Sequence, residues 1–477
     1  MKNRLYLFAS LVLCGSCGDF LEENPNDQAY VTNTDDLNEL LIGEGYMPAT
    51  TGKEIDYWIH VMDDDVLFVT SNTNRAAGSP FYWWQPDVNT QSTWESLYKR
   101  IGVLNAVLDE VERFKEEGDN YRKVKGEALF LRASYYYFLV NLYARPYRKE
   151  TAATEPGVPL KLTGTIEDKR FERHPVEACY RVITSNLKES IAHLKGLIPL
   201  TTYRGSEMAA RTLLSRVSLY TGEWEETARQ CDTVLSRGNY RLVDHKTQDI
   251  ASVSNTVAFN STETIFTSGM VTTSNMDFMS TNATKFRPSD ELLALFAAND
   301  LRRTYYIRGM PMSGYETIQK YANRVVAACS DIFIFRLPEI YLNRAEALLM
   351  LHREADAIAD LQTLRLHRLS TTPDAINLSG EALMNFIRDE RRREFCFEGQ
   401  RWFDLRRYAV HPGYPVQKEI RHAYYEYTSV SGDMVLKKYD EEPQYYVLPI
   451  PDTEINLNGG TLQQNTPREW KQQQPLQ

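Results

Sequence analysis

Three consecutive carboxylates, Asp63, Asp64 and Asp65, are the first residues of the chain whose chemistry is suggestive. Carboxylate oxygens can bind calcium, and a pair of acids can hydrolyse a glycosidic bond. The spaced ligand pattern of a calcium loop is absent, and a run of three aspartates is more typical of a solvated turn. We therefore expect neither catalysis nor metal binding from these residues.

Motifs of the common enzyme classes are missing from the rest of the sequence. The chain contains no G-x-x-x-x-G-K-[ST], no G-x-S-x-G and no H-E-x-x-H. Its eight histidines are scattered without the spacing of metal ligands. We expect a binding protein with no catalytic residues, no metal and no cofactor.

Residues 390–407 form the segment richest in charge and aromatic rings, ERRREFCFEGQRWFDLRR. Its arginines could form an anion site. The alternative is structural, because acids and arginines three residues apart on a helix can neutralise one another where helices meet. We favour the structural interpretation, with the pairs Glu390/Arg393, Glu398/Arg401 and Asp404/Arg407.

The N-terminus has the pattern of an export signal. Two basic residues precede an apolar run, residues 5–13, which is too short to span a bilayer. Gly15 and Ser16 stand before Cys17, and a lipoprotein acceptor cysteine needs such small residues before it. We therefore predict a lipoprotein signal peptide of residues 1–16 and acyl chains, including palmitate, on Cys17. An ordinary secretory signal and a redox C-x-x-C with Cys14 are the alternatives.

Composition narrows the class of partner. Lys+Arg is 54 and Asp+Glu is 64, so the formal charge is -10, and no basic block is present. Nucleic-acid binding needs clustered basic residues and is therefore not expected. The chain has 29 tyrosines, and tyrosine can serve either as core or as a flat contact surface.

Helical periodicity dominates the elements that must position these residues. Apolar residues recur at steps of three and four in residues 94–111, 124–142 and 180–198. Residues 208–240 and 337–368 each read as a helix, a turn and a second helix, as in the tetratricopeptide repeat. The sequence predicts a mostly α fold, with a tetratricopeptide-like helical-hairpin scaffold at about 92–240 and 332–410.

The remaining segments have the composition of loops. Residues 46–91 and 241–331 are rich in Ser, Thr, Asn, Gly and Asp, with few helical stripes. We predict loop-rich insertions there, a strand at 263–266, a capped helix from Ser289 and an edge strand at 445–451. Loops on a rigid scaffold usually carry the binding residues of a protein, so the insertions should face the ligand.

The 390–407 run resembles the most specific motif of the SusD/RagB family of outer-membrane nutrient-binding lipoproteins. The resemblance continues in order along nearly the whole mature chain, which we predict to be a single SusD-like domain of residues 17–477. The other matching segments are residues 17–21, 126–133, 157–160, 336–347 and 448–451.

This resemblance implies a function. A protein of this family holds oligo- or polysaccharide at the cell surface and delivers it to a TonB-dependent SusC-like transporter. The chain should then be anchored in the outer membrane by its N-terminal lipid and face the cell exterior. A tetratricopeptide-type protein or peptide scaffold, and a glycoside hydrolase, remain the alternatives.

A glycan site needs aromatic planes for the C–H faces of sugar rings and polar groups for the hydroxyls. Residues 62–90 have this mixture, and the four adjacent aromatics 81–84 should not all fit in a core. We expect the ligand to stack on Trp83, Trp84 and Tyr82 and to bond to Asp64, Asp65, Asn74 and Arg75. A second candidate surface contains Phe278 and Tyr315, with Tyr305 and Tyr306. The alternative is that a tryptophan belongs to the core.

Four cysteines remain besides the acceptor Cys17, and they are far apart in the sequence. We interpret Cys179, Cys231, Cys329 and Cys396 as mostly buried free thiols, although an exported protein could also form a disulfide.

Overall fold

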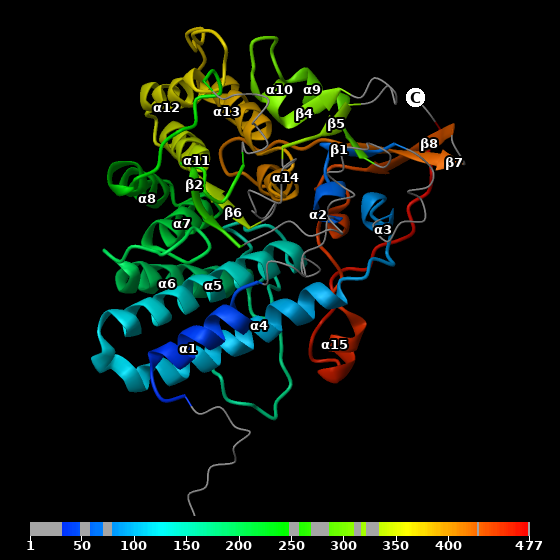
Figure 1. Ribbon diagram of the computed structural model, residues 1–477. Helices are drawn as coiled ribbons and strands as arrows, with labels where there is room; N and C mark the ends of the chain where they lie inside the picture. The colour runs from blue at the N-terminus through cyan, green and yellow to red at the C-terminus, as the bar shows by residue number, and fades with distance from the viewer. Residues whose placement is uncertain are drawn as a thin grey trace, which may run out of the picture.

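The protein is described by a computed structural model for residues 31–47, 58–69, 79–247, 257–268, 286–309, 316–320, 333–426 and 429–475 (Figure 1). Long helices stack on one side of the molecule, and short strands and small helices gather on the other. This confirms the predicted mostly α architecture. None of the helices in the described part combines the length and apolar composition that a membrane span requires.

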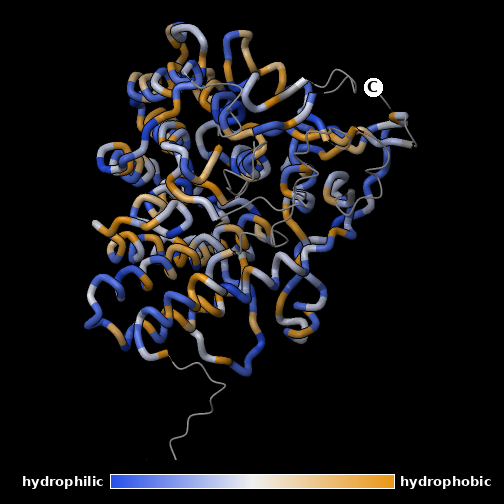
Figure 2. Tube along the Cα trace, in the orientation of Figure 1, coloured by the Kyte–Doolittle hydropathy of each residue, from blue (hydrophilic) through white to orange (hydrophobic). Residues whose placement is uncertain are grey.

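The scaffold consists of long helices, several of which form hairpins with a short turn. The long helices are α4 (Gln91–Glu110), α5 (Asp119–Tyr143), α6 (Val176–Leu194), α7 (Glu207–Thr221), α8 (Trp224–Arg237), α11 (Leu337–Met350), α12 (Glu354–Leu366) and α13 (Gly380–Phe395). The expected helical hairpins are present as α7 with α8 and α11 with α12, and α4 packs on α5. In Figure 2 apolar and polar residues alternate along these helices, as expected for helices that bury one face.

Local sequence sets the ends of the α7–α8 hairpin. Ser206 caps α7, and its hydroxyl accepts a hydrogen bond from the Ala209 backbone N–H at 3.1 Å. Gly222 ends the helix with φ +78°, in the left-handed region where glycine has no steric penalty. The chain can therefore turn directly into α8, and α11 packs against both helices.

Polar residues of the 126–133 segment hold the central helix α5 to its neighbours. Arg132 donates to Asn105 of α4 at 2.8 Å and to Asn186 of α6 at 3.0 Å. Gly126 lets α6 approach closely, since an added Cβ would lie 2.5 Å from the Leu194 side chain. This segment therefore serves the packing of three scaffold helices.

Shorter helices surround the scaffold. They are α1 (Thr34–Leu40), the π-helix η1 (Leu41–Gly45), α2 (Trp58–Val61), α3 (Ser79–Tyr82), the 3₁₀ helix η3 (Val111–Glu117), α9 (Asp290–Ala294), α10 (Arg302–Tyr306), α14 (Arg401–Ala409), the 3₁₀ helix η5 (Pro443–Tyr446) and α15 (Asp452–Leu457). Ser289 caps α9 as predicted, but η5 occupies the start of the predicted edge strand at 445–451, which is therefore wrong.

The strands form antiparallel pairs of two. They are β1 (Val66–Phe68) with β3 (Phe286–Pro288), β2 (Thr264–Thr267) with β6 (Ile334–Arg336), β4 (Ile307–Gly309) with β5 (Glu316–Ile318), and β7 (Ile420–Glu426) with β8 (Ser429–Leu436). Strand β2 confirms the strand predicted near 263–266. The β1–β3 pair joins the two loop-rich insertions to each other, and the β2–β6 pair joins the second insertion to the strand that leads into α11.

Two apolar cores hold the fold together. The larger runs through α4, α5, α6, α7 and the strand-bearing side, and the smaller lies among α11, α12 and α13. Cys179, Cys231 and Cys396 are buried free thiols, as predicted, and Cys329 lies outside the described residues.

Candidate functional site

The expected stacking rings are inside the protein. Phe81, Tyr82, Trp83 and Trp84 expose 4%, 0%, 7% and 0% of their surface. The expectation that at least one of these adjacent rings faces solvent is therefore wrong. Tyr82, Trp83 and Trp84 cannot offer a ring face to a glycan in this conformation.

The backbone explains how four successive rings are buried. Helix α3 is a single turn, so the segment follows neither a long helical nor a strand period. Trp84 then has φ +54°, a left-handed conformation that few non-glycine residues adopt. Each ring consequently packs against a different neighbouring ring. The distances between ring centroids are 4.8 Å for Phe81 and Trp58, 3.8 Å for Tyr82 and Phe68, 5.0 Å for Trp83 and Tyr424, and 4.4 Å for Trp84 and His422.

His422 on β7 completes this aromatic cluster. Its ring stacks on both Tyr82 and Trp84, with the Tyr82 centroid 4.0 Å away. Its ring nitrogens lie 2.6 Å from the Tyr82 carbonyl oxygen and 2.8 Å from that of Asp63. Burial lowers the pKa of His422 to about 4, so the ring is neutral at pH 7. The cluster has the character of a core.

The three aspartates are also buried, which corrects the expectation of a solvated turn. Arg401 donates to both oxygens of Asp64, at 2.7 and 2.8 Å, and Lys418 donates to one of them at 2.7 Å. Asp65 accepts from Arg392 at 2.7 Å. Burial alone would raise the pKa of Asp64, but Arg401 and Arg392 outweigh it and hold this pKa well below its usual range.

These contacts change the role of Asp64 and Asp65. Their carboxylates join the 62–68 segment to α13 and α14, and they are not free to bind sugar hydroxyls as predicted. Within the described ranges, no three His, Cys, Asp or Glu side chains converge as a metal site would require.

The other predicted site residues divide into two groups. Asn74, Arg75, Phe278 and Tyr315 lie outside the described residues, as does Cys17. Tyr305 and Tyr306 are described, and both are buried at 3% and 0% exposure. The Tyr305 hydroxyl donates to the His245 carbonyl oxygen at 2.7 Å. These two tyrosines are therefore structural and not part of an exposed surface.

The 390–407 run forms a buried ionic network. Glu394, fully buried, accepts hydrogen bonds from Arg302 at 3.2 Å, Arg336 at 3.1 Å and Arg368 at 2.9 Å. Burial alone would raise its pKa, but Arg368 and Arg336 hold it well below its usual range. The arginines come from α10, β6 and the end of the α12 region, so the network ties the insertions to the scaffold.

Two of the three predicted pairs in this run are confirmed: Glu390 with Arg393 at 2.7 Å and Asp404 with Arg407 at 2.9 Å. The third is wrong. Glu398 pairs instead with Arg336 and with Lys320, the latter at 2.6 Å, while Arg401 pairs with Asp64. The 67° φ of Phe397 and the 64° φ of Gly399 break the helical repeat on which the third pair depended.

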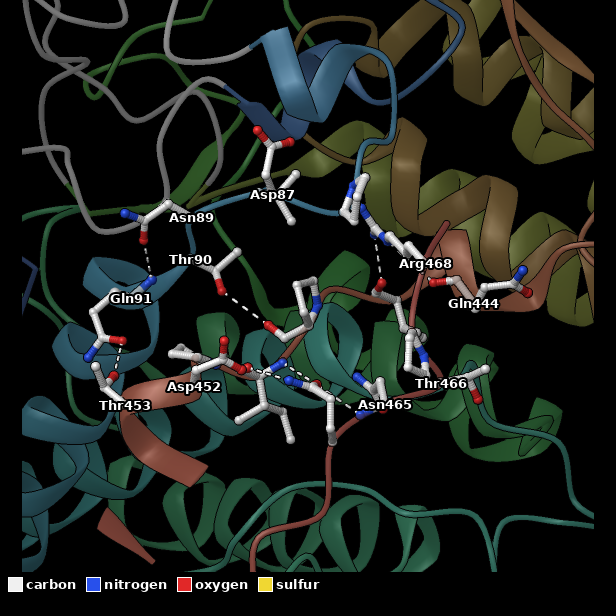
Figure 3. Close-up of a pocket in the computed structure, with 18 residues that line it drawn as sticks. Asp87, Asn89, Thr90, Gln91, Gln444, Asp452, Thr453, Asn465, Thr466 and Arg468 are labelled. Atoms are coloured by element: carbon white, nitrogen blue, oxygen red, sulfur yellow. Dashed lines mark hydrogen bonds between the residues drawn. The ribbon is translucent and has the colours of Figure 1, made fainter. Parts of the chain in front are cut away.

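The chain leaves the aromatic cluster and directly lines an open cleft of about 440 Å³ (Figure 3). It is formed by residues 86–91, which lead into α4, and by the C-terminal segments 444–453 and 464–468. In Figure 3 Thr90, Gln91, Asp452 and Thr453 lie on one side, and Gln444, Thr466 and Arg468 on the other.

Some polar side chains of this cleft hold its walls together. Thr90 donates to the Pro449 carbonyl oxygen at 3.2 Å, and Gln464 donates to that of Ile450 at 2.7 Å. Arg468 donates to the Val447 carbonyl oxygen at 2.7 Å, and its burial lowers its pKa to about 10. The walls are therefore fixed by contacts to backbone carbonyls.

Other polar side chains of the cleft remain free for a ligand. Among the described residues, the side chains of Asp87, Gln444, Asp452 and Thr466 have no hydrogen-bond partner. They offer carboxylate, amide and hydroxyl groups, and several prolines supply apolar C–H surface between them. This combination suits a ligand with hydroxyls on an apolar ring. The cleft could not be predicted from the sequence, because its walls come from segments more than 350 residues apart. The 448–451 motif was the available signal.

Comparisons with known proteins agree along the chain. Residues 254–470 match the model of the family described as "SusD family", and residues 19–219 match the one described as "Starch-binding associating with outer membrane". SusD-like protein P2 of Formosa agariphila is 20% identical over 97% of this chain and 99% of its own.

Solved structures show the same fold. A putative sugar binding protein from Bacteroides vulgatus is 24% identical with a TM-score of 0.75, over 92% of this chain and 99% of its own. A laminarin binding SusD-like protein is 19% identical with a TM-score of 0.65, over 91% and 99% of the two chains. With two matching family models that together span most of its length, this chain belongs to the SusD/RagB family.

Proposed function

We propose that this protein binds oligo- or polysaccharide at the outer membrane and delivers it to a TonB-dependent SusC-like transporter. Support comes from the family, one of whose models is described as starch-binding and outer-membrane-associated. It also comes from structural neighbours that are described as sugar binding and laminarin binding.

The open cleft of Figure 3 is the observation that carries the proposal for this chain. Its free carboxylate, amide and hydroxyl side chains can exchange hydrogen bonds with sugar hydroxyls, and its prolines can cover the apolar face of a pyranose. Asn74, Arg75, Phe278 and Tyr315 remain candidates for a second contact, with Phe278 and Tyr315 supplying rings that the cleft lacks. Such a divided site would hold a chain of sugars better than a single sugar.

The anchor follows from the N-terminal sequence. A signal peptide of residues 1–16 and lipidation of Cys17 would tether the domain to the outer membrane, and the domain would face the cell exterior. This position would let the protein meet polymers before the transporter does.

We further propose that the protein is not an enzyme. The buried aspartates that came nearest to a hydrolytic pair are occupied by arginine and lysine. Long incubation with oligosaccharides should therefore yield no new reducing ends. New ends that disappear in an Asp452→Ala protein would instead favour the hydrolase alternative.

A glycan array followed by calorimetric titration tests the proposed site. Gln444→Ala, Asp452→Ala and Thr466→Ala remove side chains that hold nothing else in the described structure. Each should weaken glycan binding about two- to twelvefold, the value of one hydrogen bond. Glu116→Ala, at an exposed residue of η3, is the matched control and should change nothing.

The same titrations separate the two candidate surfaces. If the cleft variants bind normally while Asn74→Ala, Arg75→Ala, Phe278→Ala or Tyr315→Ala bind weakly, the site lies at those four residues. If the protein binds no glycan on the array but binds peptides from a peptide library, the tetratricopeptide-type scaffold alternative replaces the proposal.

A further inference from the structure

A second, smaller cavity lies between α13, α14 and the segment that leads into β7. Its volume is about 270 Å³, and four of its lining residues are cations: Arg388, Arg392, Arg401 and Lys418. Helices α13 and α14 are neighbours in the upper half of Figure 1, and Arg391 of α13 bonds to Asp404 of α14 at 3.0 Å. The cavity is distinct from the cleft of Figure 3, with which it shares no lining residue.

Arg388 is a buried cation without an acid. Only 6% of its surface is exposed, and no carboxylate among the described residues lies within ion-pair distance. Its guanidinium rests over the Tyr408 ring at 4.5 Å and donates to the Tyr414 carbonyl oxygen at 2.6 Å. Its buried Nε–H has no hydrogen-bond partner in the described structure. Buried charges are normally paired, so this arginine lacks the partner that its environment calls for.

The other three cations already have acidic partners that are not lining residues of the cavity. Arg392 and Arg401 bond to Asp65 and Asp64, which are not lining residues. Lys418 reaches Asp64 at 2.7 Å and is one-third exposed. The cavity wall itself therefore presents cationic groups.

One acid opposes them on the wall. Asp389 lines the cavity and is exposed to solvent, so its charge is screened. Behind the wall, Asp64, Asp65 and Glu291 are already paired with Arg401, Arg392 and Lys418. Arg388 is the lining cation that has no acid partner among the described residues, so an anion in the cavity would supply the missing charge.

We propose that this cavity binds a small anionic group, a carboxylate or a sulfate, with the guanidinium of Arg388 as its principal donor and Lys418 at its rim. The group belongs either to a free small anion or to an acidic saccharide, and the second case rests on the function proposed above. The Tyr408 ring lies against the guanidinium, and Leu405, Ala409 and Val416 add apolar wall, where an ion pair is stronger than in open solvent.

The test titrates the mature protein with sodium sulfate, glucuronate and glucose at fixed ionic strength, by calorimetry and by thermal shift. Sulfate or glucuronate should bind and glucose should not. Arg388→Met keeps the length of the side chain and should weaken anion binding by at least about tenfold. Asp389→Asn removes the opposing charge and should strengthen it about two- to fivefold.

Arg388→Met and Asp389→Asn test the cavity independently of each other. If Arg388→Met fails to fold, Arg388→Lys and the exposed Asp389→Asn still test the cavity. Equal anion affinity in wild type and Asp389→Asn, or no anion-specific binding by wild type, would overturn the proposal. A merely structural role for Arg388 would change the melting temperature but not the difference between sulfate and chloride.

Two further comparisons identify the source of the anion and distinguish this proposal from the proposed glycan binding. If sulfate alone binds, the ligand is a free anion; if only sulfated or uronate-containing oligosaccharides bind, and Arg388→Met loses them, the anion is carried by the glycan. Binding of neutral glycans without any anion binding refutes this cavity alone. Anion binding without any glycan binding refutes the proposed function alone.

Discussion

Glu394 is the residue on which the ionic network of the 390–407 run depends most. It is fully buried and accepts hydrogen bonds from three arginines, Arg302, Arg336 and Arg368. In a Glu394→Gln protein the charge is lost, and the new amide NH₂ group faces guanidinium donors. Three buried cations then lack their shared acid.

The size of the expected stability loss follows from the burial of Glu394 and its arginine partners. Removing one partner of a buried ion pair costs about 3–5 kcal/mol of unfolding free energy. A domain is usually stable by only about 5–15 kcal/mol, so a large part of the total would be lost. For a chain of this length the unfolding entropy is roughly 1 kcal/mol per kelvin, so the melting temperature should fall by about 3–5 °C.

Chemical denaturation in urea and differential scanning calorimetry of the mature protein measure this change. Glu381→Gln is the matched control, because it makes the same substitution at an exposed position of α13 and should cost under about 1 kcal/mol. Equal stability losses for the two variants would refute the conclusion that this run is a structural network.

Three other predictions concern the aromatic cluster and the anchor. Trp84→Ala should lower the unfolding free energy by about 3–5 kcal/mol in denaturant titrations, because the ring is fully buried and its Nε1–H donates to the Met62 carbonyl oxygen at 3.0 Å. Normal stability together with lost glycan binding would instead place the ring in the ligand site. The pKa of His422 falls from about 6.5 unfolded to about 4 folded, so the unfolded chain takes up a proton first as the pH drops, and stability should fall by up to about 3 kcal/mol from pH 6.5 to pH 4. Urea titrations of His422→Gln between pH 6.5 and pH 4 should not show this loss of stability. A pH dependence of stability identical to that of the wild type would contradict the prediction. Cys17→Ser should release the protein from membranes in cell fractionation while Cys14→Ser stays anchored; radiolabelled palmitate on the Cys17→Ser protein would disprove the assignment.

Sequence periodicity was sufficient to predict the scaffold. The helical hairpins α7–α8 and α11–α12 depend on apolar stripes and short turns, which are local properties. The prediction of a strand at 445–451 was wrong, because its run of aromatic and aliphatic residues reflects burial in a 3₁₀ turn and in the segment that follows it.

The ligand surface could not be predicted in the same way. The burial of Trp84 depends on a left-handed backbone conformation and on His422, which lies 338 residues later in the chain. Asp64 looked free because its partners Arg401 and Lys418 are equally remote. Long-range ion pairs and ring stacks leave no periodic signal, so composition alone suggested an exposed site where the fold places a core.

Calorimetric titration of the mature protein with a neutral oligosaccharide selected from a glycan array tests the central claim most directly. The account predicts saturable binding with a Kd between about 1 mM and 1 μM, or ~4–8 kcal/mol, which weakens when Asp452 or Gln444 is replaced by alanine. Folded protein that binds no glycan on the array or in the calorimeter would contradict it.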